Sequence, residues 1–214
     1  MSPASLLESL LQLLFPDRCA GCRRFGELFC AGCQAQLSPY PPDGRAPPAS
    51  LAQVQIAYVF QSPLREAVHQ LKYRKHQRIA RPLGRLLASH MAAQAGAYDA
   101  VTAIPLHQSR LAERGFNQAE SLAREVAAAL RLPLIGGPLV RLRATEQQAK
   151  LNANGRAENM RDAFGWRGAP PPARVILVDD VYTTGATMGA CAEALLTAGS
   201  RSVAGLALAR TRLT

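Results

Sequence analysis

The sequence has no apolar run that approaches the roughly 20 residues needed to cross a bilayer, which argues against a membrane-spanning protein. Its leucine-rich start, residues 5–15, contains Glu8 and lacks a basic leader, so we expect no ordinary export signal. We therefore expect a soluble cytoplasmic protein with no membrane insertion. Charged residues make up only 19% of the chain and hydrophobic residues 48%, a balance that excludes a disordered or fibrous protein.

Lysine is also scarce, since only Lys72, Lys75 and Lys150 occur among 25 basic residues. The first 50 residues carry equal numbers of basic and acidic side chains, so the net charge of +10 lies entirely after residue 50. Such an excess favours a polyanionic partner, either a phosphate-rich small molecule or nucleic acid. A genome rich in G+C gives the same arginine bias, so clusters of charge carry more weight than the total.

A proline-rich stretch at residues 38–48 is the best domain boundary, because its prolines and the Asp43-Gly44 pair interrupt any regular element. We expect one unit at 1–48, with an amphipathic helix over 6–14 and a cysteine module, and a second unit at 49–214.

Apolar patterning in the second unit predicts alternating strands and helices, typical of an α/β sheet of parallel strands flanked by helices. The expected strands are residues 54–60, 100–105, 175–178 and 203–208. The expected helices are residues 64–73, 79–93 with an interruption near Pro82, 117–130 starting at a cap on Asn117, and a last helix that ends at Gly199.

The segment 174–188 (RVILVDDVYTTGATM) is the most informative in the chain. A buried strand ends in Asp179 and Asp180, at the edge where open α/β sheets place their ligands. A threonine-rich loop around Gly185 then opens a helix, whose free N–H groups favour an anion. The carboxylates are suited to ribose hydroxyls and the loop to phosphate, so the ligand predicted is a sugar phosphate.

Two other interpretations of this segment explain part of the pattern. An acidic pair after a strand also occurs in nucleoside triphosphatases, but the chain contains no G-x-x-x-x-G-K-[ST] loop. Capping and turn formation explain any one of these features, but not all of them in this order.

The whole string resembles the phosphoribosyl-diphosphate motif of type I phosphoribosyltransferases. The resemblance implies that Asp179 and Asp180 contact the ribose hydroxyls and act in catalysis. It also implies a 5-phosphate site formed by Tyr182, Thr183, Thr184, Gly185, Ala186 and Thr187.

Basic residues elsewhere fit the rest of such a site. Arg110 and Arg114 follow the strand at 100–105, where the type I enzymes bind diphosphate, and Lys72 and Arg74 are further candidates for the same group. Residues 141–164 form a long polar segment, expected either to close over the site as a lid or to be an exposed hairpin that binds something else. As a lid it brings the candidate catalytic residues Lys150 and Arg156 to the leaving diphosphate.

Cys19-x-x-Cys22 and Cys30-x-x-Cys33 are two knuckles with the spacing of a structural zinc site. Disulfides are less expected in a reducing compartment, and an iron–sulfur cluster or a redox pair stays open. Cys191, on the apolar face of the last expected helix, is interpreted as a core residue.

Nearly the entire chain resembles the ComF family of competence-associated, amidophosphoribosyltransferase-like proteins. The resemblance rests on Phe15-Pro16, the four cysteines, residues 71–74 (LKYR), Arg110, residues 114–118 (RGFNQ), Thr145, Gln148, Leu151, Arg156, Asn159, residues 163–164 and the final loop. It implies a type I phosphoribosyltransferase fold that binds phosphoribosyl diphosphate with magnesium, and a role in natural transformation or DNA utilisation.

Two function hypotheses follow. The first is a glycosyltransferase that moves phosphoribosyl to an acceptor that the sequence leaves open. The second is a non-enzymatic nucleotide sensor, or a module that binds single-stranded DNA or competence proteins during DNA uptake. A basic cluster near Tyr73 favours the DNA-binding form: Lys72, Arg74, Lys75, Arg78, Arg81 and Arg85.

Overall fold

The computed structural model describes residues 16–142 and 163–212. The helix expected over 6–14 and most of the polar segment 141–164 lie outside the described residues. Within the described part of the chain, no helix has both the length and the apolar character needed to span a membrane.

A five-stranded sheet forms the centre of the molecule, and every neighbouring pair of strands in it is parallel. The strand order is β1-β7-β6-β2-β3. The strands are β1 (Gln53–Val59), β2 (Ala100–Ala103), β3 (Leu134–Ile135), β6 (Arg174–Tyr182) and β7 (Ser202–Arg210). Ile176, Leu177 and Val178 in β6 are fully buried, as expected of a strand covered on both faces. The predicted α/β fold with a parallel sheet flanked by helices is confirmed.

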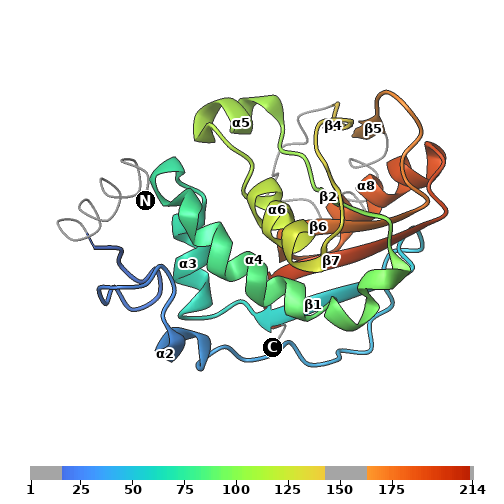
Figure 1. Ribbon diagram of the computed structural model, residues 1–214. Helices are drawn as coiled ribbons and strands as arrows, with labels where there is room; N and C mark the ends of the chain where they lie inside the picture. Colours follow the sequence, from blue (N-terminus) through green and yellow to red (C-terminus); the bar gives the residue numbers. More distant parts are fainter. Residues whose placement is uncertain (1–15, 143–162, 213–214) are drawn as a thin grey trace, which may run out of the picture.

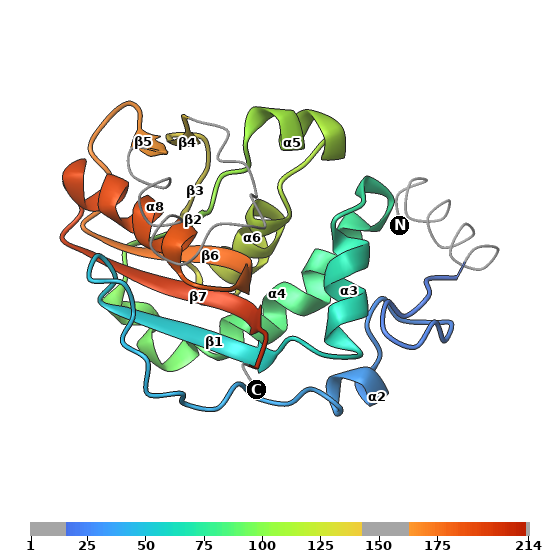
Figure 2. The ribbon, with the colours of Figure 1, turned by 180° about the vertical axis from the view of Figure 1, so that it is seen from behind.

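Helices cover both faces of this sheet (Figures 1 and 2). Three of them pack on one face: α3 (Leu64–Leu71), α4 (Ala80–Ser89) and α6 (Gln118–Leu130). Helix α8 (Ala186–Thr197) packs on the other face, over buried residues of β6 and β7. Two apolar cores result, one on each side of the sheet.

Shorter elements connect these layers. They are α2 (Ala31–Gln34), α5 (Gln108–Arg114), two 3-10 helices (Arg74–Ile79 and Ala92–Ala97), and a small antiparallel pair made of β4 (Leu139–Arg141) and β5 (Phe164–Trp166).

Helix α4 differs from its prediction, because it is not interrupted at Pro82. Pro82 is the third residue of α4, and the N–H groups of a first helical turn have no acceptor within the helix. A proline there removes no helical hydrogen bond, so the helix continues. Helix α6 starts as predicted, since the Asn117 side chain accepts a hydrogen bond from the Ala119 N–H at 3.0 Å.

Candidate functional site

Strand β6 extends further than its apolar run predicted, so the acidic pair lies inside the strand, near its C-terminal end. Both carboxylates turn back onto the backbone. Asp179 Oδ1 accepts a hydrogen bond from the N–H of Asp180 at 2.8 Å, and Asp180 Oδ1 accepts one from the N–H of Val181 at 2.9 Å. One oxygen of each side chain is thereby fixed near the C-terminal end of β6.

The second carboxylate oxygen of Asp180, Oδ2, is the most distinctive atom at this end of β6. Asp180 is only 7% exposed, and its Oδ2 is buried without a hydrogen-bond partner among the described residues. Leaving a buried acceptor unsatisfied costs about 1–3 kcal/mol. A group that donates a hydrogen bond to Oδ2 would recover that cost.

The pKa of the Asp179 carboxyl group reflects the burial of this region and the neighbouring carboxylate. Burial raises the pKa of its carboxyl group well above the usual value, and the charge of Asp180 raises it further. The positive charge of Lys72 lowers this pKa, but by less. Two carboxyl groups and one ammonium group therefore share a small region at the end of β6.

The loop after β6 leads directly into the N-terminus of α8, as the sequence predicted. Gly185 is the N-cap of α8 and has a φ of 84°, a left-handed conformation that suits glycine. A Cβ atom at this position would collide with the hydroxyl group of Tyr182. Thr183 and Thr184 are exposed, and Thr187 is half-buried in the first turn of α8. The loop thus presents hydroxyl groups and helix N–H groups side by side.

The end of the linker and the residues just after it pack beside this loop, which the sequence interpretation missed. Ser50 Oγ donates a hydrogen bond to the carbonyl of Gly189 at 2.8 Å. Pro48 packs so tightly on α8 that a Cβ added at Gly189 would lie 2.9 Å from the Pro48 side chain. Residues 48–50 are therefore fixed against the first turn of α8, beside the loop of residues 182–187.

A basic cleft of about 860 Å³ lies between α3 and α5. Three of the four candidate diphosphate residues line it, namely Lys72, Arg110 and Arg114. The side chain of the fourth, Arg74, lies outside the described part of the chain, as do Lys150 and Arg156. Arg114 donates to Gln118 at 2.9 Å, which orients its guanidinium group. Because the charge of Lys72 lowers the pKa of Asp179, this cleft lies near the acidic pair.

Arg141, in β4, is a further basic residue of this region that the sequence analysis did not single out. Burial lowers the pKa of its guanidinium group, and the positive charge of Arg110 lowers it further. Nothing in the local sequence marks Arg141, because it comes close to Arg110 only through folding.

Two members of the expected basic cluster, Arg78 and Arg81, do not line the basic cleft. Arg78 and Arg81 line a separate cavity of about 290 Å³ together with Arg124. Arg78 also pairs with Asp17 at 2.8 Å. These two arginines therefore lie in a different cavity from Tyr73.

The four cysteines come together as predicted and can hold a metal ion, since their Sγ atoms all lie within 4.8 Å of one another. Cys19 and Cys33 are separated by 3.6 Å, as are Cys22 and Cys30. Four Zn–S bonds of about 2.3 Å in a tetrahedron place the sulfur atoms about 3.8 Å apart. The cluster therefore has the dimensions of a tetrathiolate site.

The acidity of one of these thiols, Cys19, fits metal binding, because the thiolate is the form that binds a metal. Burial acts to raise the pKa of Cys19, but the backbone N–H groups of Cys22, Cys30 and Gly21 lower it to about 6. Burial and hydrogen bonds from the other cysteines raise the pKa of Cys33. Cys191, by contrast, is fully buried in the core beneath α8, and its position confirms its interpretation as a core residue.

The cysteine module, residues 17–37, packs directly against α3. Gln70 Nε2 donates to the carbonyl of Ala20 at 2.8 Å. Phe29 and Cys33 belong to the same buried cluster as Val68 and Leu71. Since Lys72 follows Leu71, the module supports the helix end that carries a lysine of the basic cleft.

The chain is similar in sequence to proteins named for competence and DNA utilization. The chain is 32% identical to the DNA utilization protein YhgH of Escherichia coli K12, over 90% of this chain and 88% of that protein. It is 29% identical to competence protein F of Haemophilus influenzae, over 92% and 98% respectively, and 36% identical to competence protein ComFC of Streptococcus pneumoniae, over 50% and 46%.

No protein-family model matches the chain. A crystal structure of TT1426 from Thermus thermophilus aligns with a TM-score of 0.36 and 18% identity, over 60% of this chain and 83% of that one. The similarity to YhgH extends over most of both sequences, and together with the similarity to competence protein F it shows that this chain belongs to the ComF family.

Proposed function

We propose that this protein binds phosphoribosyl diphosphate and transfers its phosphoribosyl group to an acceptor. The observation that carries the proposal is the unsatisfied, buried Oδ2 of Asp180, at a sheet edge flanked by the phosphate loop and the basic cleft. A ribose hydroxyl is a donor of the right kind for this atom, and the groups on either side suit the two phosphorylated ends of the same ligand.

Each group then has a role that follows from its charge. The loop of Tyr182–Thr187 binds the 5-phosphate, and the acidic pair holds the ribose hydroxyls. The two carboxylates also favour the positive charge that develops on the ribose ring as the diphosphate departs. Lys72, Arg110 and Arg114 stabilise the departing diphosphate, with Arg74, Lys150 and Arg156 proposed for the same function.

Two metal ions complete the proposal. Magnesium, when bound with the diphosphate, supplies positive charge to the leaving group. Zinc is the ion proposed for the four cysteines, because thiolate ligands in tetrahedral geometry are typical of structural zinc.

Calorimetric titration of phosphoribosyl diphosphate in the presence of magnesium tests binding, and release of diphosphate tests turnover. We expect binding by the wild-type chain and a loss of about tenfold or more in Asp180→Asn, which keeps the shape but removes the charge. Glu193→Gln is the matched control, because Glu193 is an exposed acid in α8, the helix that follows the loop. Absence of magnesium-dependent binding by the wild-type chain would sink the proposal.

The biological setting proposed is DNA uptake and use. The relatives are named for competence and DNA utilization, and we propose that this chain acts in natural transformation or in the use of the DNA taken up. Deletion of the coding sequence is expected to reduce transformation, and Asp180→Asn to reduce it equally if the phosphoribosyl site is responsible.

One observation favours single-stranded DNA as an alternative ligand. Tyr73 is 68% exposed and lines the basic cleft beside Lys72, so a base can stack on it while its phosphates contact the cations. Stacking on an aromatic residue contributes about 1–3 kcal/mol per base. Affinity for an oligonucleotide should then fall steeply with salt, fall in Tyr73→Ala, and be competed by phosphoribosyl diphosphate. A flat salt response counts against DNA binding.

A further inference from the structure

Asp43, in the linker, forms an ion pair with Arg210, the last residue of β7. Arg210 Nη1 lies 2.8 Å from Asp43 Oδ2, although the two residues are 167 positions apart. The same carboxylate oxygen accepts a hydrogen bond from the Tyr40 hydroxyl at 3.0 Å, and Arg210 is only 7% exposed. The ion pair therefore ties the linker to the C-terminal end of the sheet.

Arg210 extends this contact to the end of β6. In the parallel register of the two strands, Arg210 is the partner of Tyr182, the last residue of β6. The guanidinium carbon of Arg210 lies 5.0 Å from the ring centre of Tyr182 and 5.6 Å from that of Tyr40, within the range of a cation–π contact with each ring. A guanidinium group that contacts two rings and a carboxylate has little freedom to move, so it fixes the Tyr182 ring in turn.

Tyr182 packs directly on the turn that opens α8. A Cβ atom added at Gly185 would collide with the Tyr182 hydroxyl group and would lie 3.2 Å from the Pro48 side chain. Gly185 is thus in close contact with one residue of β6 and one residue of the linker. Since Gly185 is the N-cap of α8, the side chains that pack on it determine where the first N–H groups of the helix point.

The charge of Asp43 acts mainly through Arg210. The other arginine near it, Arg45, lies 3.8 Å from the carboxylate and has half of its side chain exposed, so that contact contributes little. The Arg210 side chain is only 9% exposed, and a buried cation that loses its acid is left without compensation. Without the charge of Asp43, Arg210 should turn toward water and release the Tyr182 ring.

We propose that Asp43 and Arg210 are positioning residues for the proposed 5-phosphate site, and that they act through Tyr182 to hold the loop of residues 182–187 in its phosphate-binding conformation. The proposal rests on the proposed function. It gives the linker a role in ligand binding beyond its connection of the cysteine module to the sheet. Asp43 and Arg210 themselves are assigned no contact with the ligand.

Calorimetric titration with two separate probes, ribose 5-phosphate and magnesium diphosphate, tests this role. Asp43→Asn keeps the shape of the side chain but removes its charge. We expect this variant to bind ribose 5-phosphate about tenfold more weakly, because the loop must then be ordered when the ligand binds. Magnesium diphosphate, proposed to bind in the basic cleft, should bind the variant and the wild type alike. Equal losses for both probes would mean a general loosening of the fold and would overturn the proposal.

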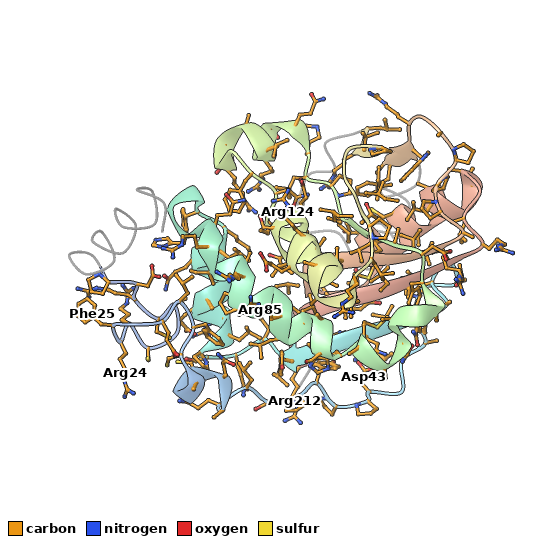
Figure 3. The ribbon with its side chains drawn as sticks, viewed as in Figure 1. Arg24, Phe25, Asp43, Arg85, Arg124 and Arg212 are labelled. Carbon is orange, nitrogen blue, oxygen red and sulfur yellow. The ribbon has the colours of Figure 1, made fainter. Side chains whose placement is uncertain are left out.

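Asp17→Asn is the matched control, because Asp17 pairs with Arg78 at the same distance of 2.8 Å. Asp17 belongs to the cysteine module, which lies at the other end of the molecule from Asp43 in the view of Figure 3, where Arg24 and Phe25 mark it. This variant should bind ribose 5-phosphate as the wild type does. Asp43→Glu, which keeps the charge, should retain most of the affinity. Equal binding by Asp43→Asn and the wild type overturns the proposal.

Hydrogen exchange of the ligand-free chain measures the order of the loop without a ligand. The N–H of Gly189 donates to the carbonyl of Gly185 at 2.8 Å, so its exchange reports on the turn that opens α8. In Asp43→Asn this amide should exchange about tenfold faster than in the wild type. Amides in the middle of α6 should exchange at the same rate in both proteins.

Together the two measurements separate this proposal from the proposed function. If the wild type binds ribose 5-phosphate but exchange at Gly189 is unchanged in Asp43→Asn, the positioning proposal is wrong and the proposed function stands. If the wild type does not bind ribose 5-phosphate, the proposed function fails, and the role of the ion pair in phosphate binding fails with it. Faster exchange at Gly189 then still assigns the ordering of the loop to Asp43 and Arg210.

Discussion

Lys72, at the end of α3, lies near enough to Asp179, in β6, for its positive charge to lower the pKa of that carboxyl group. Burial and the neighbouring Asp180 act in the opposite direction and outweigh it. The free protein therefore holds an acidic pair that is only partly compensated. Under the proposed function, a ligand that brings hydroxyl donors and cations to the end of β6 would relieve the remaining repulsion.

The raised pKa of Asp179 predicts a specific dependence of stability on pH. Because the folded chain holds the proton of Asp179 more tightly than the unfolded chain, the contribution of this group is fully present below its ordinary pKa of 3.8. It is lost as the pH rises toward the raised value. Asp179→Asn lacks this loss, and each kcal/mol regained raises the melting temperature by about 2–4 °C.

Melting curves of the ligand-free chain between pH 4 and pH 8 provide the measurement. The variant should gain stability over the wild type as the pH rises, while it loses affinity for phosphoribosyl diphosphate. Parallel melting profiles for the two proteins would show that Asp179 ionises without cost, and would contradict the prediction.

Lys72 should matter for diphosphate more than its exposure suggests. A hydrogen bond to a charged group contributes about 1.5–3 kcal/mol, so Lys72→Gln is expected to weaken binding of magnesium diphosphate by about 10-fold to 100-fold. Calorimetric titration measures the change. Arg85→Gln, an exposed arginine on α4 that Figure 3 labels, removes the same charge away from the cleft and should leave affinity within about twofold. Equal losses in both variants would mean that only net charge matters.

The sequence predicted the strand, loop and helix at the centre of this candidate site because their signal is local. The apolar run, the two acids and the loop around Gly185 occur within 15 consecutive residues, and their order alone defines a strand, a loop and a helix. The cysteine cluster was predictable for the same reason, since each knuckle is a short motif of fixed spacing.

Features that depend on contacts between distant residues were not predictable. Ser50 and Gly189 are 139 positions apart and Asp43 and Arg210 are 167 apart. The prolines of the linker therefore predicted a domain boundary, but not the contacts that this region makes with the end of the chain. Arg141 was missed for the same reason. The strands β3 and β4, of two and three residues, are too short to show a period of their own.

The cysteine module should depend on its metal. In small zinc peptides the ion contributes an apparent binding free energy of about 10–16 kcal/mol, so we expect Cys33→Ser to lose the metal and to lower the melting temperature. Elemental analysis should find one zinc per chain in the wild type and none in this variant. Cys191→Ala changes a buried cysteine outside the cluster and should keep its zinc. Because the module packs on α3, metal loss should also weaken diphosphate binding through Lys72.

Gly84 should tolerate no side chain, although it lies inside a helix. A Cβ atom at this position would collide with Glu125 Cβ and would lie 3.2 Å from the backbone carbonyl oxygen of Leu122, both in α6. Alanine normally stabilises a helix interior by about 0.5–1 kcal/mol relative to glycine. Neither atom is the end of a flexible side chain, so α4 and α6 must move apart, and overpacking of this kind costs about 1–3 kcal/mol.

We therefore expect Gly84→Ala to be destabilising, with urea denaturation as the measurement. Gly96→Ala is the control, because no atom lies within 4 Å of a Cβ atom added at Gly96, and its stability should stay within about 0.5 kcal/mol of the wild type. If Gly84→Ala is as stable as Gly96→Ala, then the approach of α4 to α6 is looser than the structure shows. A loss confined to Gly84→Ala instead means that helix packing, and not helix propensity, selects glycine at this position.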